Sequence, residues 1–243
     1  MTKPGYDLPP LIEGELIKRY KRFLADVTLD SGEVVTAHCP NSGSMRGCAI
    51  PGSRVWLSES DNPKRKLKYT WELAQVPGSR IGINTQIPNK LVKTAIETGQ
   101  IEELAEFTRV KSEVKTSEHT RLDLAIEAED GRKGYVEIKN CTLVEEGIAM
   151  FPDAVTTRGQ KHLDELVRLA AEGYRAVIFY LIQRTDAQVF TPAAAIDPVY
   201  AEKLKFARDN GVEIITRDTV FDPGCIRVNQ PVPVSFDVSQ KRG

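Results

Sequence analysis

The sequence of 243 residues has few cysteines, no long hydrophobic run and almost no net charge. Its four cysteines, Cys39, Cys48, Cys141 and Cys225, stand too far apart to predict a disulfide scaffold. No apolar run approaches the roughly 20 residues that a membrane-spanning helix needs. The first ten residues lack the apolar segment of a signal peptide. We therefore expect a cytoplasmic protein with no membrane partner.

The sequence also argues against a zinc site. His38, Cys39 and Cys48 lie near one another in the chain, but their spacing matches no paired pattern of zinc ligands and a fourth ligand is not apparent. We expect no zinc and no organic cofactor. The composition is that of an ordinary folded protein, with 41% hydrophobic and 28% charged residues. This length allows one large domain or two smaller ones.

The net charge of −1 hides an uneven distribution of charge along the chain. Residues 1–80 carry 12 Lys and Arg against 9 Asp and Glu, whereas residues 81–243 carry 21 against 25. Two basic clusters of the first part lie beside aromatic residues. Such clusters neutralise phosphates and the rings can stack on bases, but they are also typical of an exposed strand edge. The predicted nucleic-acid contacts are Lys18, Arg19, Lys21, Arg22, Lys64, Arg65, Lys66 and Lys68, with Trp71 or Tyr20 as the stacking face.

Residues 1–80 are rich in short extended segments, and no long helical pattern interrupts them. We predict strands at 13–29, 34–37, 54–58 and 66–76. Several short strands in such a small region predict an OB-like β-barrel. The polar loop Asn41-Ser42-Gly43-Ser44 could donate hydrogen bonds to phosphates or to the other domain. Pro77-Gly78-Ser79 is the predicted linker between the two domains.

Residues 81–243 alternate between helical and extended patterns, which predicts an α/β domain with a mixed sheet. Asn89 is the expected cap of the first helix. The near-continuous apolar run within 175–183 is typical of a strand buried on both faces. The expected order is helix 90–98, strands 107–115, 121–128 and 134–141, helix 157–171, strand 175–183, helix 197–210 and strand 212–215.

Charged residues on two of the predicted strands indicate a catalytic site. Glu137 and Lys139 share a face because strand side chains alternate, and the turn Asp130-Gly131 brings Asp123 across from Glu137. Carboxylates are the ligands that hard divalent cations prefer, and a neighbouring lysine can activate the attacking water. We predict metal-assisted phosphodiester hydrolysis with Mg²⁺ or Mn²⁺. The alternative is an exposed sheet face with cross-strand charge pairs.

Three further carboxylates are weaker candidates for the predicted metal site. Glu113, on the first strand of the second domain, is either a third metal ligand or a surface charge. Glu97 or Glu103 could supply a ligand from the preceding helix.

The segment before the second helix of this domain carries several polar residues. Pro152-Asp153 follows Glu137 in the sequence, and we interpret it as a loop that leads into the helix. Arg158, Gln160 and Lys161 open that helix, where a phosphate would be favourably placed, although they also fit an ordinary polar helix surface.

The order Asp123, Glu137, Lys139 resembles the core of PD-(D/E)xK nucleases. The chain as a whole resembles the sugar fermentation stimulation protein A (SfsA) family. The blocks that carry this resemblance cover nearly the whole chain: RYKRFLADV at 19–27, AHCPNSGSM at 37–45, RKLKYTWEL at 65–73, YVEIK at 135–139, and FPDAVT at 151–156 followed by RGQKHL at 158–163.

The resemblance implies an OB-like barrel, a nuclease-like second domain, DNA binding without sequence specificity and a link to genes of sugar utilisation. The basic region contains no predicted recognition helix, which also argues for little sequence preference. Two alternatives stay open: a DNA-binding transcriptional regulator without enzymatic activity, and a nuclease that processes RNA. The sequence does not decide between a monomer and a homodimer.

Overall fold

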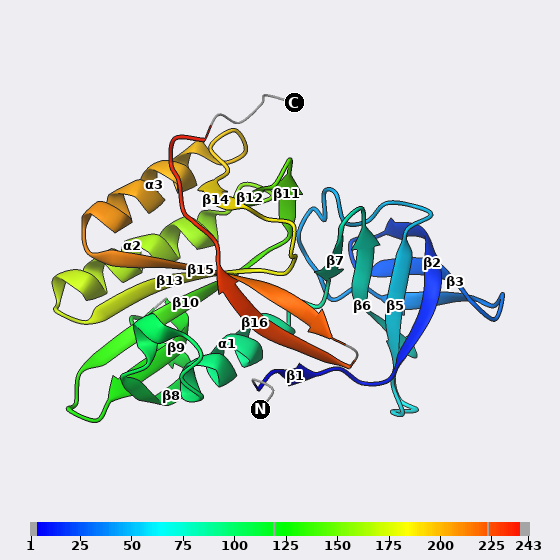
Figure 1. Cartoon of the computed structure of the whole chain (residues 1–243), viewed down its shortest axis with the longest axis horizontal. Coiled ribbons are helices and arrows are strands. Elements are labelled where there is room, and N and C mark those ends of the chain that lie inside the picture. Colours follow the sequence, from blue (N-terminus) through cyan, green and yellow to red (C-terminus); the bar gives the residue numbers. More distant parts are fainter. Residues whose placement is uncertain (1–3, 119, 223, 239–243) are drawn as a thin grey trace.

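The first sheet of the protein closes into a barrel. The computed structural model describes residues 4–118, 120–222 and 224–238. The sheet has the order β4-β3-β2-β5-β6-β7, and a parallel pairing of β4 with β6 closes it (Figure 1). Its interior is filled by alternating apolar side chains, as the period-2 pattern predicted. The strands are β2 (Leu11–Tyr20), β3 (Leu24–Leu29), β4 (Val34–His38), β5 (Arg54–Glu59), β6 (Tyr69–Val76) and β7 (Ser79–Gly82).

The single strand predicted at 13–29 is in fact the hairpin of β2 and β3. Lys21 and Arg22 form its turn with positive φ angles of 47° and 64°. Gly or Asn usually occupies such positions, so the sequence carried no signal for this turn. Its consequence is that both basic side chains are exposed at the tip of the hairpin.

The predicted linker at 77–79 is a second hairpin turn. Val76 pairs with Ser79, and Gly78 has a φ of 79° that glycine adopts without strain. Strand β7 therefore belongs to the barrel, which the predicted boundary at residue 80 would cut. The boundary also differs at the start of the chain, because β1 (Tyr6–Asp7) pairs with a strand of the second domain.

The second domain is built on a mixed sheet of order β1-β16-β15-β13-β10-β9-β8. Neighbours β10, β13 and β15 are parallel, while β8, β9 and β16 run antiparallel to their partners. The strands are β8 (Phe107–Lys115), β9 (Arg121–Ala128), β10 (Lys133–Cys141), β13 (Arg175–Ile182), β15 (Val212–Asp222) and β16 (Cys225–Pro231). The sequence did not reveal β16 or the small sheet of β11 (Leu143–Glu145), β12 (Ile148–Phe151) and β14 (Val189–Pro192).

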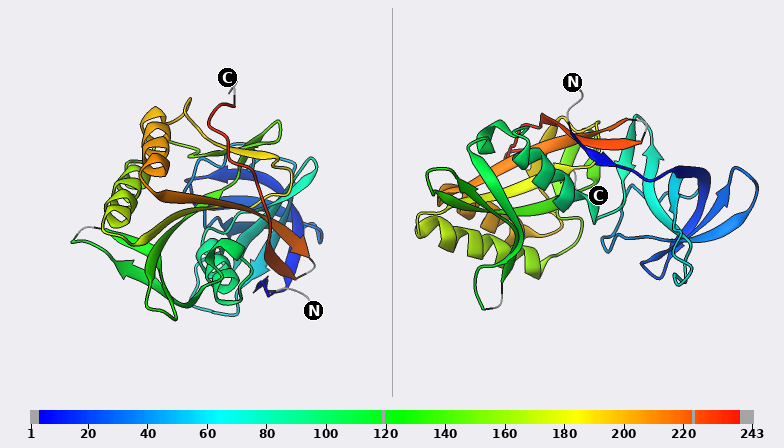
Figure 2. Two further views of the ribbon diagram at one scale, coloured as in Figure 1. Left: turned by 60° about the vertical axis from the view of Figure 1, so that its left-hand side comes forward. Right: turned by 90° about the horizontal axis from the view of Figure 1, so that it is seen from below.

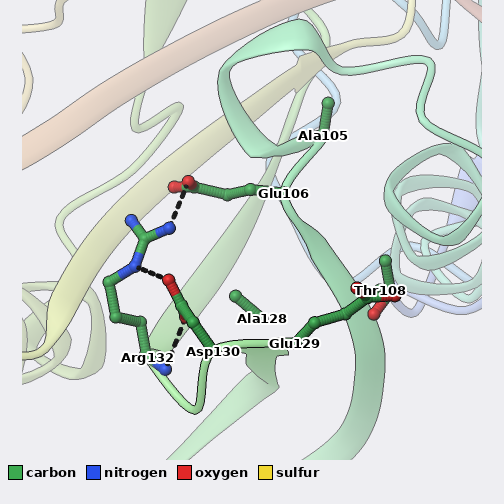
Figure 3. A pocket seen from close by; sticks show the side chains of 7 residues that line it. All are labelled: Ala105, Glu106, Thr108, Ala128, Glu129, Asp130 and Arg132. Atoms are coloured by element: carbon green, nitrogen blue, oxygen red, sulfur yellow. Dashed lines mark hydrogen bonds and ion pairs between the residues drawn. The ribbon is translucent and has the colours of Figure 1, made fainter.

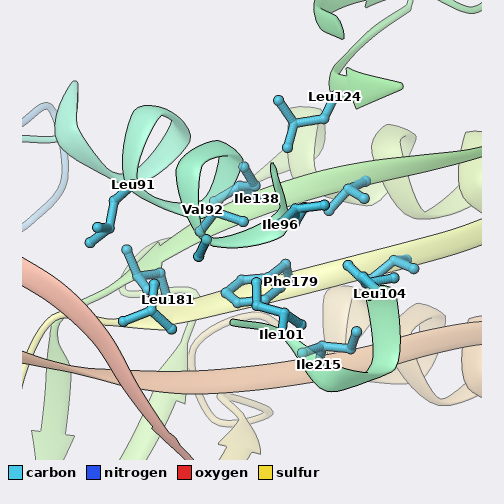
Figure 4. Packing of buried hydrophobic residues seen from close by; sticks show 14 of the residues in the cluster. Leu91, Val92, Ile96, Ile101, Leu104, Leu124, Ile138, Phe179, Leu181 and Ile215 are labelled. Carbon is cyan, nitrogen blue, oxygen red and sulfur yellow. The ribbon is translucent and has the colours of Figure 1, made fainter. Parts of the chain in front are cut away.

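Helices cover both faces of this sheet (Figure 2). Helix α1 (Ile87–Glu97) packs Leu91, Val92 and Ile96 on one face, in the cluster shown in Figure 4. The short 3₁₀ turn η1 (Glu102–Leu104) adds to the same side. Helices α2 (Thr157–Ala171) and α3 (Pro198–Asp209) pack on the other face and match the predicted helices closely. Among the described helices, none is long and apolar enough to cross a membrane.

One loop of the barrel, residues 41–45, forms hydrogen bonds with the second domain. The Arg19 guanidinium donates to the backbone oxygens of Asn41, Gly43 and Ser44, at 2.9, 3.1 and 3.3 Å. From the second domain, Asp153 accepts from Ser44 N at 2.8 Å and from Ser44 Oγ at 2.9 Å. Of the two predicted uses of this loop, the structure shows the contact with the other domain. Arg19 supports the loop, and its contact with phosphate stays a prediction.

Candidate active site

Asp123 lies where the pairing of β9 with β10 ends. The last paired residues are Leu124 and Val136. Beyond them, Asp123 Oδ2 accepts a hydrogen bond from the backbone N–H of Ile138 at 2.8 Å. Its other oxygen, Oδ1, accepts from Asn89 Nδ2 of α1, also at 2.8 Å. The carboxylate is thus fixed between the helix and the segment Glu137-Ile138-Lys139.

The alternation of side chains breaks at this point of β9. Leu124 packs in the cluster that contains α1, whereas Leu122 packs in the cluster that contains α2. On the neighbouring strand, Ser112 pairs with Leu124 and Val114 with Leu122, so Glu113 lies opposite Asp123. Glu113 has a positive φ of 56°, which marks the irregularity. Asp123 therefore reaches the site through a local irregularity and not through simple alternation.

Glu137 is the most deeply buried acid of the site, with 3% of its surface exposed. Its Oε1 accepts from Lys139 Nζ at 2.6 Å and is also in contact with His162 Nδ1. Its Oε2 is buried and has no hydrogen-bond partner among the described residues. A buried polar atom without a partner costs about 1–3 kcal/mol, so a ligand for Oε2 would be stabilising.

His162 of α2 is a site residue that the sequence analysis missed. It is 7% exposed, and its Nδ1 lies 3.3 Å from Lys139 Nζ. Its other nitrogen, Nε2, lies 3.4 Å from Arg158 Nε, one helical turn earlier. A histidine beside Leu163 on the buried side of a predicted helix is a signal that could have identified it.

The surroundings of the site shift the pKa values of its two carboxyl groups in opposite directions. Burial, together with repulsion from Glu137, raises the pKa of Asp123 to about 6. Burial alone would also raise the pKa of Glu137, but the Lys139 ammonium and the hydrogen bond with His162 hold it below its usual value. Glu137 is therefore ionised at neutral pH, while Asp123 titrates close to neutrality.

The residues present fit a hard divalent cation such as Mg²⁺ or Mn²⁺. The unpartnered Glu137 Oε2 and the Asp123 carboxylate would hold it. In the part of the chain that the structure describes, no group of three or more His, Cys, Asp or Glu is arranged to bind a metal. Two carboxylates are nevertheless sufficient for Mg²⁺, which usually keeps several waters and takes further ligands from substrate phosphates.

The other predicted carboxylates have different partners. Glu113 is exposed and lies 3.6 Å from Arg121 Nη1, so its role as a ligand stays a prediction. Glu97 pairs with Lys93 within α1, and Glu103 pairs with Arg217 of β15 at 2.5 Å. The helix residue that contacts Asp123 is instead Asn89. It was predicted to cap α1, but the helix begins three residues earlier than predicted and places Asn89 within its first turn.

The residues that open α2 divide into two groups. Gln160 Nε2 donates to both oxygens of Asp197, the N-cap of α3, at 3.0 and 3.1 Å. This bond orients Gln160 toward α3, and its role in binding phosphate stays a prediction. Arg158 and Lys161 are exposed, and their role in binding phosphate stays a prediction.

The aromatic residues of the barrel differ from the prediction. Trp71 is fully buried in the barrel core, and its Nε1 donates to Leu73 O at 2.9 Å. It offers no face to a base, which corrects its assignment. Phe23, which follows the basic turn of the β2–β3 hairpin, is 44% exposed and its ring is stacked with that of His38. Tyr20 is half-buried and donates to Asp26 Oδ1.

The basic side chains of the barrel are mostly exposed. Lys18 keeps 62% of its side chain exposed, with Asp26 at 3.7 Å, and Lys68 pairs with Glu59. The remaining exposed basic residues, for which contact with nucleic acid stays a prediction, are Lys21, Arg22, Lys64, Arg65 and Lys66.

A hollow of about 440 Å³ lies at the opposite end of β9 and β10 from Asp123 (Figure 3). Arg132 bonds with two of its three acids, Glu106 and Asp130, both at 2.7 Å. Its lining contains no histidine, no lysine and no buried carboxylate oxygen without a partner, so it lacks the features of the site around Glu137.

Comparison with known proteins identifies the family to which both domains belong. Residues 17–83 match the SfsA N-terminal OB domain, and residues 86–224 match the sugar fermentation stimulation protein RE domain. The chain belongs to the SfsA family. Sugar fermentation stimulation protein homologs of Pelobacter propionicus and Geobacter metallireducens are 54% and 53% identical over 93% of this chain, covering 98% and 97% of their own lengths. The SfsA of Pyrococcus furiosus, solved in complex with Ca²⁺, superposes with a TM-score of 0.86 at 29% identity, over 95% of this chain and 98% of that one.

Proposed function

We propose that this SfsA-family protein is a divalent-cation-dependent nuclease of the cytoplasm that binds DNA through its barrel with little sequence preference. The observation that carries the proposal is Glu137, which is buried, ionised and left with an unpartnered oxygen beside Asp123 and Lys139. The Ca²⁺ in the related protein of Pyrococcus furiosus supports a cation site in this family.

Each residue of the trio has a distinct part in the proposed reaction. Asp123 and Glu137 would hold Mg²⁺ or Mn²⁺, which as a Lewis acid polarises the scissile phosphodiester and offsets the charge of the attack. Lys139 Nζ lies 2.6 Å from Glu137 Oε1 and forms an ion pair with it. It can therefore orient the attacking water and stabilise negative charge that develops on the phosphate.

The barrel would supply the affinity for DNA. Its exposed lysines and arginines neutralise phosphates, and this type of binding depends strongly on salt and little on sequence. The described residues of the barrel, 4–83, form strands and turns without a helix that could enter the major groove. Phe23 takes the place of Trp71 as the proposed stacking face.

The test is a cleavage assay of the protein and its Lys139→Ala variant on linear, nicked, branched and single-stranded DNA. Each reaction contains Mg²⁺, Mn²⁺ or EDTA. The control is Lys133→Ala, which removes an exposed lysine at the start of the same strand. We expect metal-dependent cleavage that Lys133→Ala retains and Lys139→Ala loses. Circular dichroism verifies that both variants are folded.

A DNA-binding regulator without enzymatic activity is the second candidate. It is favoured by the convergence of only two carboxylates within the described chain and by the pairing of Glu137 with Lys139. In that case the wild type and Lys139→Ala bind DNA equally, neither cleaves it, and Mg²⁺ does not change binding. Competition with RNA shows in the same experiment whether RNA is the preferred substrate.

A further inference from the structure

We propose that His162 is a positioning residue of this site. Its Nδ1–H fixes one oxygen of Glu137 and thereby directs the other oxygen toward the cation. The inference rests on the proposed function, because it assigns a role within the same metal site. Three observations support it: the tautomer that the neighbours of His162 select, the convergence of donors on one oxygen of Glu137, and the rigidity of α2.

The neighbours of His162 select its tautomer. Nδ1 is in contact with Oε1 of Glu137, a carboxylate oxygen that accepts, so Nδ1 carries a proton and donates it. A lone pair on Nε2 agrees with Arg158 Nε, a donor 3.4 Å away. Lys139 Nζ lies 3.3 Å from Nδ1 but donates to Glu137 Oε1 at the shorter distance of 2.6 Å.

Two donors thus converge on one oxygen of Glu137. Lys139 Nζ donates to Oε1 at 2.6 Å, and His162 Nδ1 donates to the same atom. None of the described residues donates to Oε2. A carboxylate can rotate and exchange its two oxygens, but this asymmetry holds Oε1 on the side of α2 and leaves Oε2 free for a cation.

Of these two donors, His162 is the rigid one. Lys139 is on the same strand as Glu137 and has a flexible stem, so it can follow the carboxylate. His162 comes from a different element, α2, and is buried against Glu137 and Lys139 of β10. The helix is fixed at its start, where Thr156 Oγ1 accepts from Gly159 N at 3.0 Å. Donors of this kind behind a metal ligand typically change metal affinity about 10- to 100-fold.

The experiment compares His162→Leu with His162→Asn in calorimetric titrations of the metal-free full chain with Ca²⁺. Leu removes the donor, whereas the Nδ2 of Asn can occupy the place of the histidine Nδ1. We expect Leu to weaken Ca²⁺ binding about 10- to 100-fold and Asn to stay close to the wild type. A second readout needs no variant: ¹H–¹⁵N NMR of the wild type should show a protonated Nδ1 and a bare Nε2 in His162.

The outcomes separate this inference from the function on which it rests. If the wild type does not bind Ca²⁺, the metal site itself fails, and the role of His162 fails with it. If the wild type binds and His162→Leu binds equally well, the site stands and the inference is overturned. Equal losses in Leu and Asn would overturn the donor argument. An Nδ1 without a proton in the NMR spectrum would also overturn it, even if no variant folds.

Discussion

Replacement of Asp123 by Asn is expected to stabilise the metal-free protein at neutral pH, although it removes a proposed metal ligand. In the folded protein, burial and the charge of Glu137 raise the pKa of Asp123 from 3.8 to about 6. The difference between these two pKa values corresponds to a loss of at most about 3 kcal/mol in the free energy of unfolding. It is an upper bound, because the side chain keeps some contact with solvent.

Proton linkage determines whether the charge of Asp123 stabilises or destabilises the folded protein. The folded state binds this proton more tightly than the unfolded chain, so ionisation of Asp123 destabilises the folded state. This destabilisation is absent below the unfolded pKa of 3.8 and complete above about pH 6. Asn carries no charge at any pH, and the variant therefore lacks this loss of stability.

The hydrogen bonds of the site can survive the substitution. The Oδ1 of Asn at position 123 can accept from Ile138 N as the carboxylate does. Its Nδ2 then faces Asn89, whose amide turns over to present its own Oδ1. Loss of the charge is therefore the main change.

Thermal unfolding in EDTA at about pH 4.5 and about pH 8 measures the effect. At the higher pH we expect a gain of up to about 3 kcal/mol, or about 6–12 °C in Tm for a protein of this size, and at the lower pH a much smaller gain. Asp130→Asn is the matched control, since Arg132 lowers the pKa of Asp130 and its loss should not stabilise the protein. An equal gain at both pH values, or none at pH 8, would refute the reasoning.

Three further predictions concern the barrel and its contact with the second domain. Trp71→Ala should lower the free energy of unfolding by about 3–5 kcal/mol in thermal unfolding. Phe23→Ala should change that free energy by less than about 0.5 kcal/mol and should weaken the binding of single-stranded DNA in fluorescence anisotropy. Equal stabilities of the two variants would contradict the assignment of Trp71 to the core and of Phe23 to the surface. Asp153→Ala should cost about 1–3 kcal/mol and speed proteolysis of the loop at 41–45, and resistance equal to wild type would count against the contact. Neutralising Lys21 and Arg22 together should reduce the slope of log K against log salt by up to about 2, and an unchanged slope would exclude them from binding.

Elements with a strong local pattern were predictable from the sequence. Helix α2 and the buried strand β13 agree with the prediction within a residue, because apolar spacing and flanking turn residues coincide there. The hairpin at Lys21-Arg22 was missed, since the residues of its turn are neither Gly nor Asn. Pro77-Gly78 was interpreted as a linker because tight turns and linkers share the same composition.

The candidate site was predictable only where its residues belong to one hairpin. The β9–β10 turn brings Asp123 to the segment that holds Glu137, which the sequence could indicate, but the alternating pattern did not show the irregularity that turns Asp123 into the site. His162 belongs to α2, and its contact with Glu137 depends on how the helix lies across the sheet. The pattern of β6 likewise did not show that Trp71 points into the barrel, because polarity on both sides of the strand is mixed.

The pairing of β1 with β16 makes the barrel an insertion within the second domain. Tyr6 and Asp7 pair with Ile226 and Cys225, so the chain starts in the sheet, leaves it to build the barrel, and returns at α1. No single cut between the two regions separates them cleanly, because removing the barrel with its leading segment would strip the cover from β16 and expose an open sheet edge. During synthesis, β1 emerges well before β16 and can pair with it only after most of the sheet has been made.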